Sequence, residues 1–266
     1  MLNNSSNSTT SLKKVPSIKM PFTFSHPAII LPLGKSKKIP LSFTGLIAGS
    51  VAPDFEFLLR LRNTENFGHT WWGLLVCDIP FAILLSFVFH YVVRNTLIWH
   101  LPEYFRQRFS TLVSFNWWFY LRQHIVNFLV AVVIGILSHF FLDAFTHHNT
   151  TIEQWYPFFA SKIIIFKQPI PVYVLLQIFT SVLGGVYILW VISTIQPGNE
   201  LQRKKNIFSY WVWLSVLSVL IFALRLLVDK VHQSTADIII AAVGSVVYAL
   251  LIITLCYFKR NSSSKV

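Results

Sequence analysis

Five long apolar segments decide what this chain can fold into. Each holds close to the about 20 residues that a helix needs to cross the hydrocarbon core of a bilayer. Backbone polar groups in lipid must pair within their own segment, which selects α-helices. Only 12% of the residues are charged, which is too few to cover the surface of a soluble domain. The sequence therefore predicts an all-α polytopic integral membrane bundle with about five full transmembrane helices, near residues 71–93, 125–146, 171–195, 207–227 and 236–258.

Two shorter apolar pieces precede these segments. Residues 21–33 are too few to span a bilayer, whereas 41–59 are enough but include Pro53, Asp54 and Glu56. We expect an N-terminal membrane-embedded hairpin around the basic turn at 35–38. Residues 1–19 are polar and rich in Ser and Asn, which predicts a disordered tail. The expected organisation is this tail, with Met20 as a second candidate start, then one membrane domain at 20–260 and a cytoplasmic tail at 261–266.

The net charge of +12 raises nucleic acid as a partner, but the basic residues lie between apolar spans and not on one soluble face. They act instead as topology signals and as contacts to anionic lipid head groups. Most of them fall in alternate segments, which predicts that those segments and the C-terminus face the cytoplasm. These are Lys35, Lys37 and Lys38, then Arg94, Arg106, Arg108 and Arg122, then Arg203, Lys204 and Lys205, and finally Lys259, Arg260 and Lys265. Segments 60–70, 147–169 and 228–235 would then face outward.

Three ionisable residues inside the second long span are candidates for a site. His139, Asp143 and His147 recur at intervals of four, which places them on one helical face. Imidazole and carboxylate are ligands that suit zinc and related divalent ions. The spacing alone leaves two interpretations open: a metal site, or a polar stripe that is hydrogen-bonded between helices.

Chain length brings further residues to the same depth. When the basic segments are held inside, His26, Asp54 and His69 all reach the outer half of the bilayer. This convergence favours the metal site. Other polar residues have simpler interpretations: Glu56 pairing with Arg60, His148 as a substitute for His147 or an interfacial residue, His90 and His100 as interfacial residues, and Gln177 as either a site residue or a bond to a neighbouring helix.

Four motifs carry a resemblance to a known family. They are MPFTFSHPA at 20–28, AGSVAPDFE at 48–56, His69-Thr70, and SHFFLDAFTH at 138–147. In this order they resemble the bacterial domain-of-unknown-function 4184 family, from Met20 to about Gly185, although members usually have His-Ser where this chain has His69-Thr70. The last two spans match only as apolar segments. The His and Asp pattern is also similar to that of the YdjM-like membrane-bound metal-dependent hydrolases. The resemblance implies a metal site at His26, Asp54, His69, His139, Asp143 and His147, in a protein of the bacterial inner membrane.

The resulting hypothesis is a metal-dependent hydrolase with one or two divalent ions, zinc among them, in which a water activated by the metal is the nucleophile. Glu56 is the candidate catalytic base, with Asp54 as a second choice. Membrane lipids surround the site, so a lipid-like or phosphoester substrate is expected. The alternatives are a transporter, a metal-binding protein without turnover, or a structural membrane protein.

Overall fold

The structure, a computed structural model, describes residues 23–34, 40–62, 70–198, 206–228 and 235–263. The predicted tail at 1–19, the turn at 35–38 and His69 lie outside the described residues. The elements are η1 (Thr23–Ile29), α1 (Leu31–Gly34), α2 (Phe43–Arg60), α3 (Trp71–Gly73), η3 (Leu74–Asp78), α4 (Ile79–Val88), η4 (Phe89–Val93), α5 (Arg94–His100), α6 (Glu103–Phe109), η5 (Ser110–Leu112), α7 (Trp117–Gln123), α8 (Ile125–Thr146), α9 (Thr151–Trp155), η6 (Pro157–Ala160), β1 (Lys162–Ile165), β2 (Gln168–Pro171), α10 (Val172–Ser193), α11 (Ile207–Val228) and α12 (Thr235–Ser263). Of these, η3 and η4 are π-helical.

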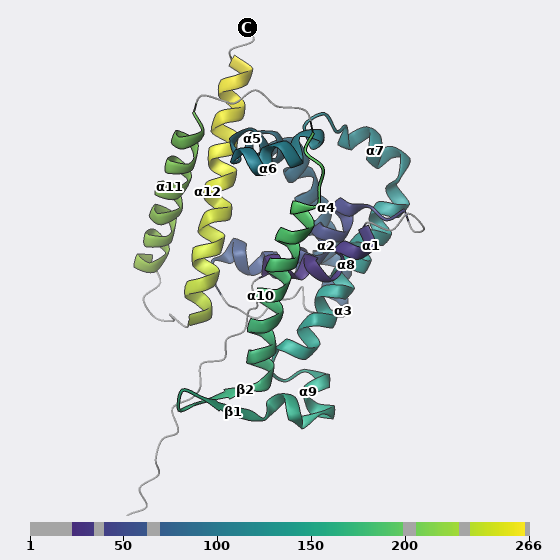
Figure 1. Cartoon of the computed structure of the whole chain (residues 1–266), viewed down its shortest axis with the longest axis vertical. Coiled ribbons are helices and arrows are strands. Elements are labelled where there is room, and N and C mark those ends of the chain that lie inside the picture. Colours follow the sequence, from purple (N-terminus) through teal and green to yellow (C-terminus); the bar gives the residue numbers. More distant parts are fainter. Residues whose placement is uncertain (1–22, 35–39, 63–69, 199–205, 229–234, 264–266) are drawn as a thin grey trace, which may run out of the picture.

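Five helices in the described part of the chain are long and apolar enough to cross a membrane. They are Leu74–His100, Ile125–Thr146, Val172–Ser193, Ile207–Val228 and Thr235–Tyr257. In Figure 1, α10, α11 and α12 run broadly along the long axis, and α11 packs beside α12. The protein is therefore a polytopic helical membrane bundle, and the five predicted spans are confirmed.

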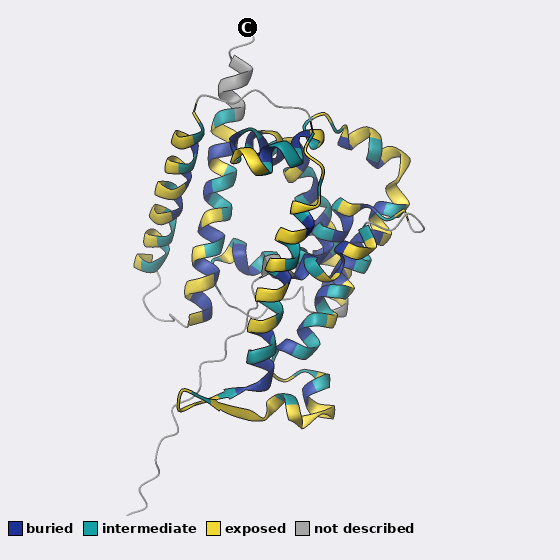
Figure 2. Ribbon diagram, in the orientation of Figure 1, coloured by how far each residue is buried: buried dark blue, intermediate teal, exposed yellow. Residues whose placement is uncertain are grey.

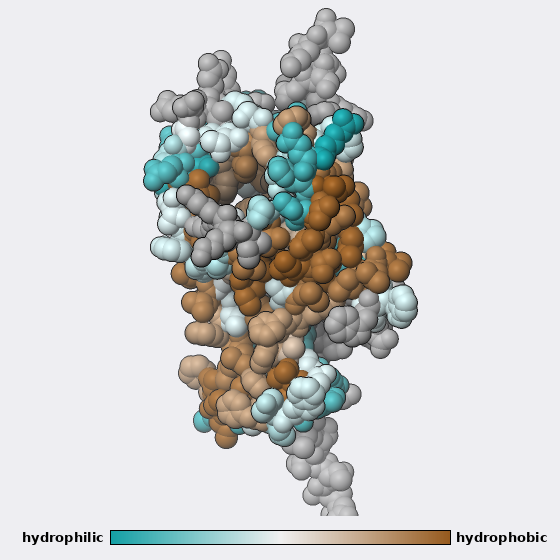
Figure 3. All heavy atoms as spheres, turned by 90° about the vertical axis from the view of Figure 1, so that its right-hand side faces the viewer, coloured by the Kyte–Doolittle hydropathy of each residue, from teal (hydrophilic) through white to brown (hydrophobic). Residues whose placement is uncertain are grey.

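The outer surface of the bundle is apolar. Figure 2 shows exposed residues along the outward sides of α10 and α11, and only 6% of the apolar window of α11 is buried. Figure 3 shows hydrophobic side chains covering the middle of another face, with hydrophilic ones gathered near one end. An exposed apolar surface this broad marks contact with lipid.

The first span is longer than predicted, because the helix that begins at Trp71 continues to His100. Pro80 has no N–H to donate, and the turns just before it are π-helical, with Ile79 N–H bonded to Leu74 O. Both His90 and His100 lie within this helix and are buried, at 5% and 0% exposure. They therefore contact protein, and their predicted interfacial position stays a prediction.

The hairpin arm α2 packs along α8, and this is the contact on which the site depends. Gly45 and Gly49 are four residues apart and therefore share one face of α2. A Cβ at Gly45 would lie 2.7 Å from Phe128 O, and one at Gly49 would overlap Val132 O. Gly135 of α8 is equally close to α2, since a Cβ there would lie 2.8 Å from Ser50 N. The missing side chains let the two backbones approach closely.

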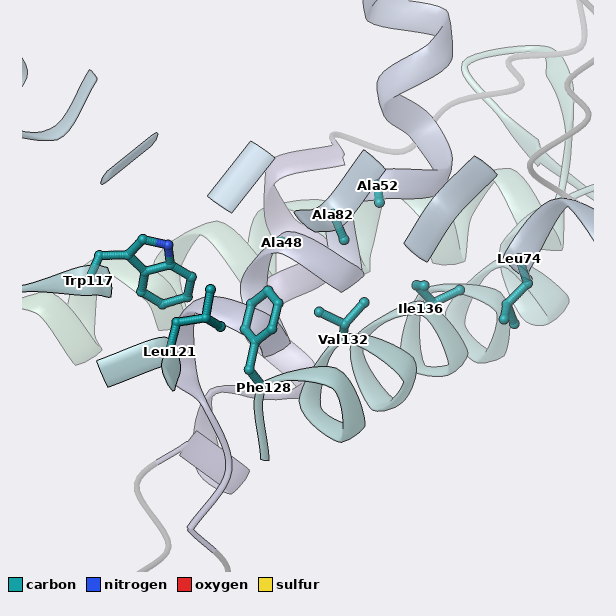
Figure 4. Close-up of a cluster of buried hydrophobic side chains, with 9 residues drawn as sticks. All are labelled: Ala48, Ala52, Leu74, Ala82, Trp117, Leu121, Phe128, Val132 and Ile136. Atoms are coloured by element: carbon teal, nitrogen blue, oxygen red, sulfur yellow. The ribbon is translucent and has the colours of Figure 1, made fainter. Parts of the chain in front are cut away.

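Apolar side chains flank this close contact. Figure 4 shows Phe128, Val132 and Ile136 in a row along α8, on the side that faces Ala48 and Ala52 of α2. The row continues beyond α8 through Leu121 and Trp117, and Ala82 and Leu74 of the first span complete the cluster. The small alanines and large aliphatic residues interdigitate, which fixes the register of α2 on α8.

The two ends of the bundle differ. Figure 1 shows α5, α6 and α7 at the end where the C-terminus lies, and α9 with the β-hairpin at the opposite end. Strands β1 and β2 pair antiparallel, with Lys162 opposite Pro171. This separation agrees with the alternation predicted from the basic residues: the 94–122 loop and the C-terminus lie together, and the 147–169 segment lies across the bundle from them.

Candidate metal centre

His139 is fixed in the bundle by the backbone of α2. Its ring is fully buried, and Nδ1 lies 2.9 Å from the Ser50 carbonyl oxygen. A carbonyl can only accept, so Nδ1 must carry a proton and donate it. The neutral ring therefore presents the lone pair of Nε2 to the site, which is the orientation that a backbone acceptor gives to a metal-binding histidine.

Asp143, one turn further along α8, lies among three histidines. Its Oδ2 is 3.1 Å from His139 Nε2. Its Oδ1 is 3.8 Å from His26 Nε2 and 3.4 Å from His147 Nδ1. The two oxygens of one buried carboxylate thus face different histidines.

His26 enters the cluster from η1, a short 3-10 helix that packs on α2, α8 and α10. Its ring is stacked on that of His139, with the ring centres 4.1 Å apart and the planes 20° from parallel. His26 is 0% exposed, and neither ring nitrogen has a hydrogen-bond partner among the described residues. A buried imidazole in this state is costly unless a ligand completes it.

Asp54 of α2 adds a second carboxylate to the cluster. It is 3% exposed, and its Oδ1 lies 3.6 Å from His139 Nε2. The ion pairs described for Asp54 and Asp143 are all with histidines. Two buried carboxylates beside several imidazoles form a donor set that a divalent cation could bind.

The donor separations fit a bound ion. Donors held about 2.0–2.2 Å from one tetrahedral ion lie about 3.4 Å from each other. The separations from His139 Nε2 to the two carboxylates are 3.1 and 3.6 Å, and that from His26 Nε2 to Asp143 is 3.8 Å. One donor atom each from His26, His139 and Asp143 lies within 4.8 Å of the others. These three residues can hold a metal ion with small side-chain adjustments.

His147 reaches the cluster by a route that helical spacing does not describe. It follows the last residue of α8 and has extended backbone angles, φ −119° and ψ 157°. The side chain therefore turns back toward Asp143, although it is 21% exposed. His148 instead pairs with Glu153, with 2.9 Å between Nδ1 and Oε1.

The remaining predicted residues are not brought into this cluster by the described structure. Glu56 forms the expected ion pair with Arg60, at 2.6 Å, and lies about 200° around α2 from Asp54. Its catalytic role stays a prediction. The Gln177 side chain is buried, and neither its oxygen nor its nitrogen has a hydrogen-bond partner among the described residues.

Two polar groups, one in the cluster and one beside it, were not predicted from the sequence. The Ser50 carbonyl is a backbone atom, and no residue type signals its role. The position of Glu153 could have been predicted, because Thr150 and Glu153 form the Thr-x-x-Glu pattern of a helix N-cap. Thr150 Oγ1 does accept the Glu153 backbone N–H at 3.2 Å, and the Glu153 carboxylate accepts from the Asn149 backbone N–H and contacts His148.

Fold and site together define a polytopic membrane protein with a buried His/Asp cluster that could hold a metal ion. Residues 20–257 match the model of a family described as Domain of unknown function (DUF4184). The chain belongs to this family, and the match extends beyond the motifs to α11 and most of α12. Neither a curated protein nor a solved structure matches the chain.

Proposed function

We propose that this protein is a metal-dependent hydrolase of the bacterial inner membrane. The observation that carries the proposal is the buried convergence of His26, His139 and Asp143 from two separate chain segments, with donor separations suited to one ion. The mixture of imidazole and carboxylate donors favours zinc. Asp54 supplies a further carboxylate, with its Oδ1 at 3.6 Å from the same His139 Nε2 atom that faces Asp143.

The cluster offers donors for one ion or two. Asp143 Oδ2 faces His139, while Oδ1 faces His26 and His147. A carboxylate with this division can bridge a pair of ions, as in two-metal hydrolytic sites. A metal content of two per chain would assign His147 to the second ion.

The chemistry proposed is hydrolysis of a phosphoester or another lipid-like ester. A bound divalent cation would supply Lewis-acid activation of water and of a substrate oxygen. The protein's own residues orient the site: the Ser50 carbonyl holds His139 in place, and His147 lies at the more exposed end of the cluster. With the C-terminus in the cytoplasm, that end lies toward the outer surface, where lipid head groups are found.

The first test is metal content. Protein purified without chelator should contain zinc or a related ion by elemental analysis, and His139→Ala and Asp143→Ala should contain none while still inserting into the membrane. His124→Ala is the matched control, because His124 is exposed at the other end of α8. Wild-type protein without metal would leave the cluster as a set of His–Asp ion pairs that hold the bundle together.

The second test is turnover. Metal-loaded and chelator-treated protein should be compared on synthetic phospholipids and soluble phosphoesters. Hydrolysis that depends on the metal and on Asp143 is the expected result. Metal bound in the absence of any hydrolysis would identify a transporter or a non-catalytic metal-binding protein instead.

A further inference from the structure

Arg94 carries a buried positive charge in a different part of the fold. It begins α5 and is 6% exposed. Its described partners are all uncharged: Nε donates to Asn95 Oδ1 at 2.9 Å, and Nη1 donates to the Phe115 carbonyl at 2.9 Å and to His90 Nδ1 at 3.1 Å. No carboxylate pairs with Arg94 in the part of the chain that the structure describes. Burying a charge without a counter-charge is costly, and a bound anion would lower this cost.

The hydrogen bonds make His90 a neutral positioning group for Arg94. A guanidinium only donates, so His90 Nδ1 must accept from it. The ring proton is then on Nε2, which donates to Thr44 Oγ1 at 3.0 Å. Trp117 stacks on the same ring, with 4.3 Å between ring centres. These contacts hold Arg94 in place without neutralising it.

The guanidinium borders an open space. A cavity of about 500 Å³ is lined by Arg94, Asn95, Ser114, Asn116, His90 and Trp117, among others. The Nη2 group of Arg94 has no hydrogen-bond partner among the described residues. The indole N–H of Trp117, which is also buried, likewise has no acceptor there. The cavity therefore has donors and positive charge to offer and no described acidic group on its wall.

We infer that this cavity is a binding site for a phosphate-class anion, held by the Arg94 guanidinium with Asn95, Ser114 and Asn116 as neutral partners. Arginine presents a planar pair of donors that matches phosphate oxygens. The site is separate from the metal centre: Thr44, which contacts His90, precedes Asp54 by ten residues of α2, or about 15 Å of helix. The inference therefore does not depend on the proposed hydrolase.

An anionic phospholipid head group is the source that the surroundings favour. Tyr91 lines the cavity and is 53% exposed, and the neighbouring Trp118 and Phe119 are 45% and 61% exposed. Exposed aromatic rings of this kind lie at membrane–water interfaces. The cavity belongs to the end of the bundle that carries α5, α6 and α7 (Figure 1), where Arg106, Arg108 and Arg122 also lie and basic residues attract anionic lipid. A soluble phosphate compound offers the same chemistry and is the second source.

The test uses thermal unfolding of the delipidated full-length protein in detergent. Phosphatidylglycerol should raise Tm more than phosphatidylcholine does, at fixed ionic strength. In a second arm, inorganic phosphate is compared with chloride. A response to phosphatidylglycerol alone assigns the lipid head group, whereas a response to phosphate that competes with the lipid assigns a soluble compound.

Asn95→Asp is the informative variant, because it keeps the acceptor for Arg94 Nε and adds the missing negative charge. It should fold and lose about tenfold or more of the anion affinity, as expected when a charged hydrogen bond is lost. Arg94→Gln should also lose the response, and Arg122→Gln, an exposed arginine of the same loop, should keep it. Equal responses to both lipids and to both salts would overturn the inference. So would an anion response that survives in Asn95→Asp, or one that falls as far in Arg122→Gln.

Discussion

The orientation of His139 shows how one backbone atom can define a side chain's chemistry. Since Nδ1 donates to the Ser50 carbonyl, only Nε2 is available to Asp54, Asp143 or an ion. The Ser50 hydroxyl does not make this contact, because it donates to the Ile47 carbonyl at 2.9 Å. The position of the α2 backbone, and not the serine side chain, is what this interaction requires.

Variants of Asp54 and Glu56 can distinguish a residue that binds the metal from one that acts as the general base. Asp54→Asn should lower metal affinity by about 10–100-fold, because it removes one carboxylate from the His139 side of the cluster. Glu56→Gln should leave metal content unchanged, because Glu56 pairs with Arg60. Competition of each purified variant with a fluorescent zinc chelator measures the affinities.

Activity then decides the role of Glu56. If it is the base, Glu56→Gln should lower kcat by about 10²–10⁴-fold with metal still bound. An unchanged kcat would remove Glu56 from the mechanism. Equal metal affinity in the Asp54→Asn and wild-type proteins would exclude Asp54 as a ligand.

Side-chain spacing could predict some site residues and not others. His139 and Asp143 follow from their interval of four, because both lie within α8. His147 was placed on the same helical face, but α8 ends at Thr146 and the extended backbone at His147 sets its position. Only the family resemblance and the depth argument indicated His26, since its 3-10 helix has no amphipathic pattern. The anion cavity was missed because Arg94 was interpreted as a topology signal and His90 as interfacial.

At the scale of elements, the contact between α2 and α8 couples packing to the site. Gly135 lies one turn before His139, and Gly49 directly precedes Ser50. A side chain added at any of these glycines would push α2 away from α8. It would therefore separate Asp54, which lies on α2, from Asp143, which lies on α8. The glycines therefore help to position the His/Asp cluster without touching it.

Gly135→Ala should destabilise the protein and loosen the site together. Its new Cβ would lie 2.8 Å from Ser50 N and 3.0 Å from Gly49 Cα, an overpacking that costs about 1–3 kcal/mol. Gly185→Ala is the control, because nothing lies within 4 Å of a Cβ there. Thermal unfolding in detergent should show a lower Tm for Gly135→Ala only, and elemental analysis should show less bound metal. A Gly135→Ala protein as stable and as metal-rich as wild type would contradict the close contact.

Hydropathy predicted the five long spans well and failed where polar residues are buried by protein. The span at 125–146 was predicted with the bounds of α8, because lipid sets both ends of an apolar helix. The sequence predicted that the first span ends near residue 93, whereas the helix continues to His100. Arg94 and His100 can lie in this helix because neighbouring segments bury them. Burial of this kind depends on tertiary contacts, which local composition does not contain.

At the scale of the whole molecule, the distribution of basic residues predicts orientation. The C-terminus lies at one end of the bundle with α5 and α6, and α9 lies at the other end (Figure 1). Arg106, Arg108 and Arg122 lie in α6 and α7 at the first end, and the Lys/Arg pattern of the sequence predicts that this end faces the cytoplasm.

Reporter fusions test this orientation. Alkaline phosphatase should be inactive when fused after Val266 and active when inserted at Gln154 of α9, while a fluorescent protein should give the opposite pattern. Phosphatase activity at the tail but not at Gln154 would reverse the orientation and move the metal cluster to the cytoplasmic half.

The dependence of α2 on α8 has a consequence for biogenesis. Helix α2 is not among the helices apolar enough to cross a membrane, and the residues that join it to α8, Ser50 and His139, are 89 positions apart. At about 5–20 residues per second, the ribosome needs roughly 5–20 s to make that length. A lone carboxylate such as Asp54 is costly in lipid, so we expect α2 to wait at the translocon or the membrane surface until α8 emerges. Ribosome-arrested chains that stop before α8 should thus leave α2 open to protease, and chains that include α8 should protect it.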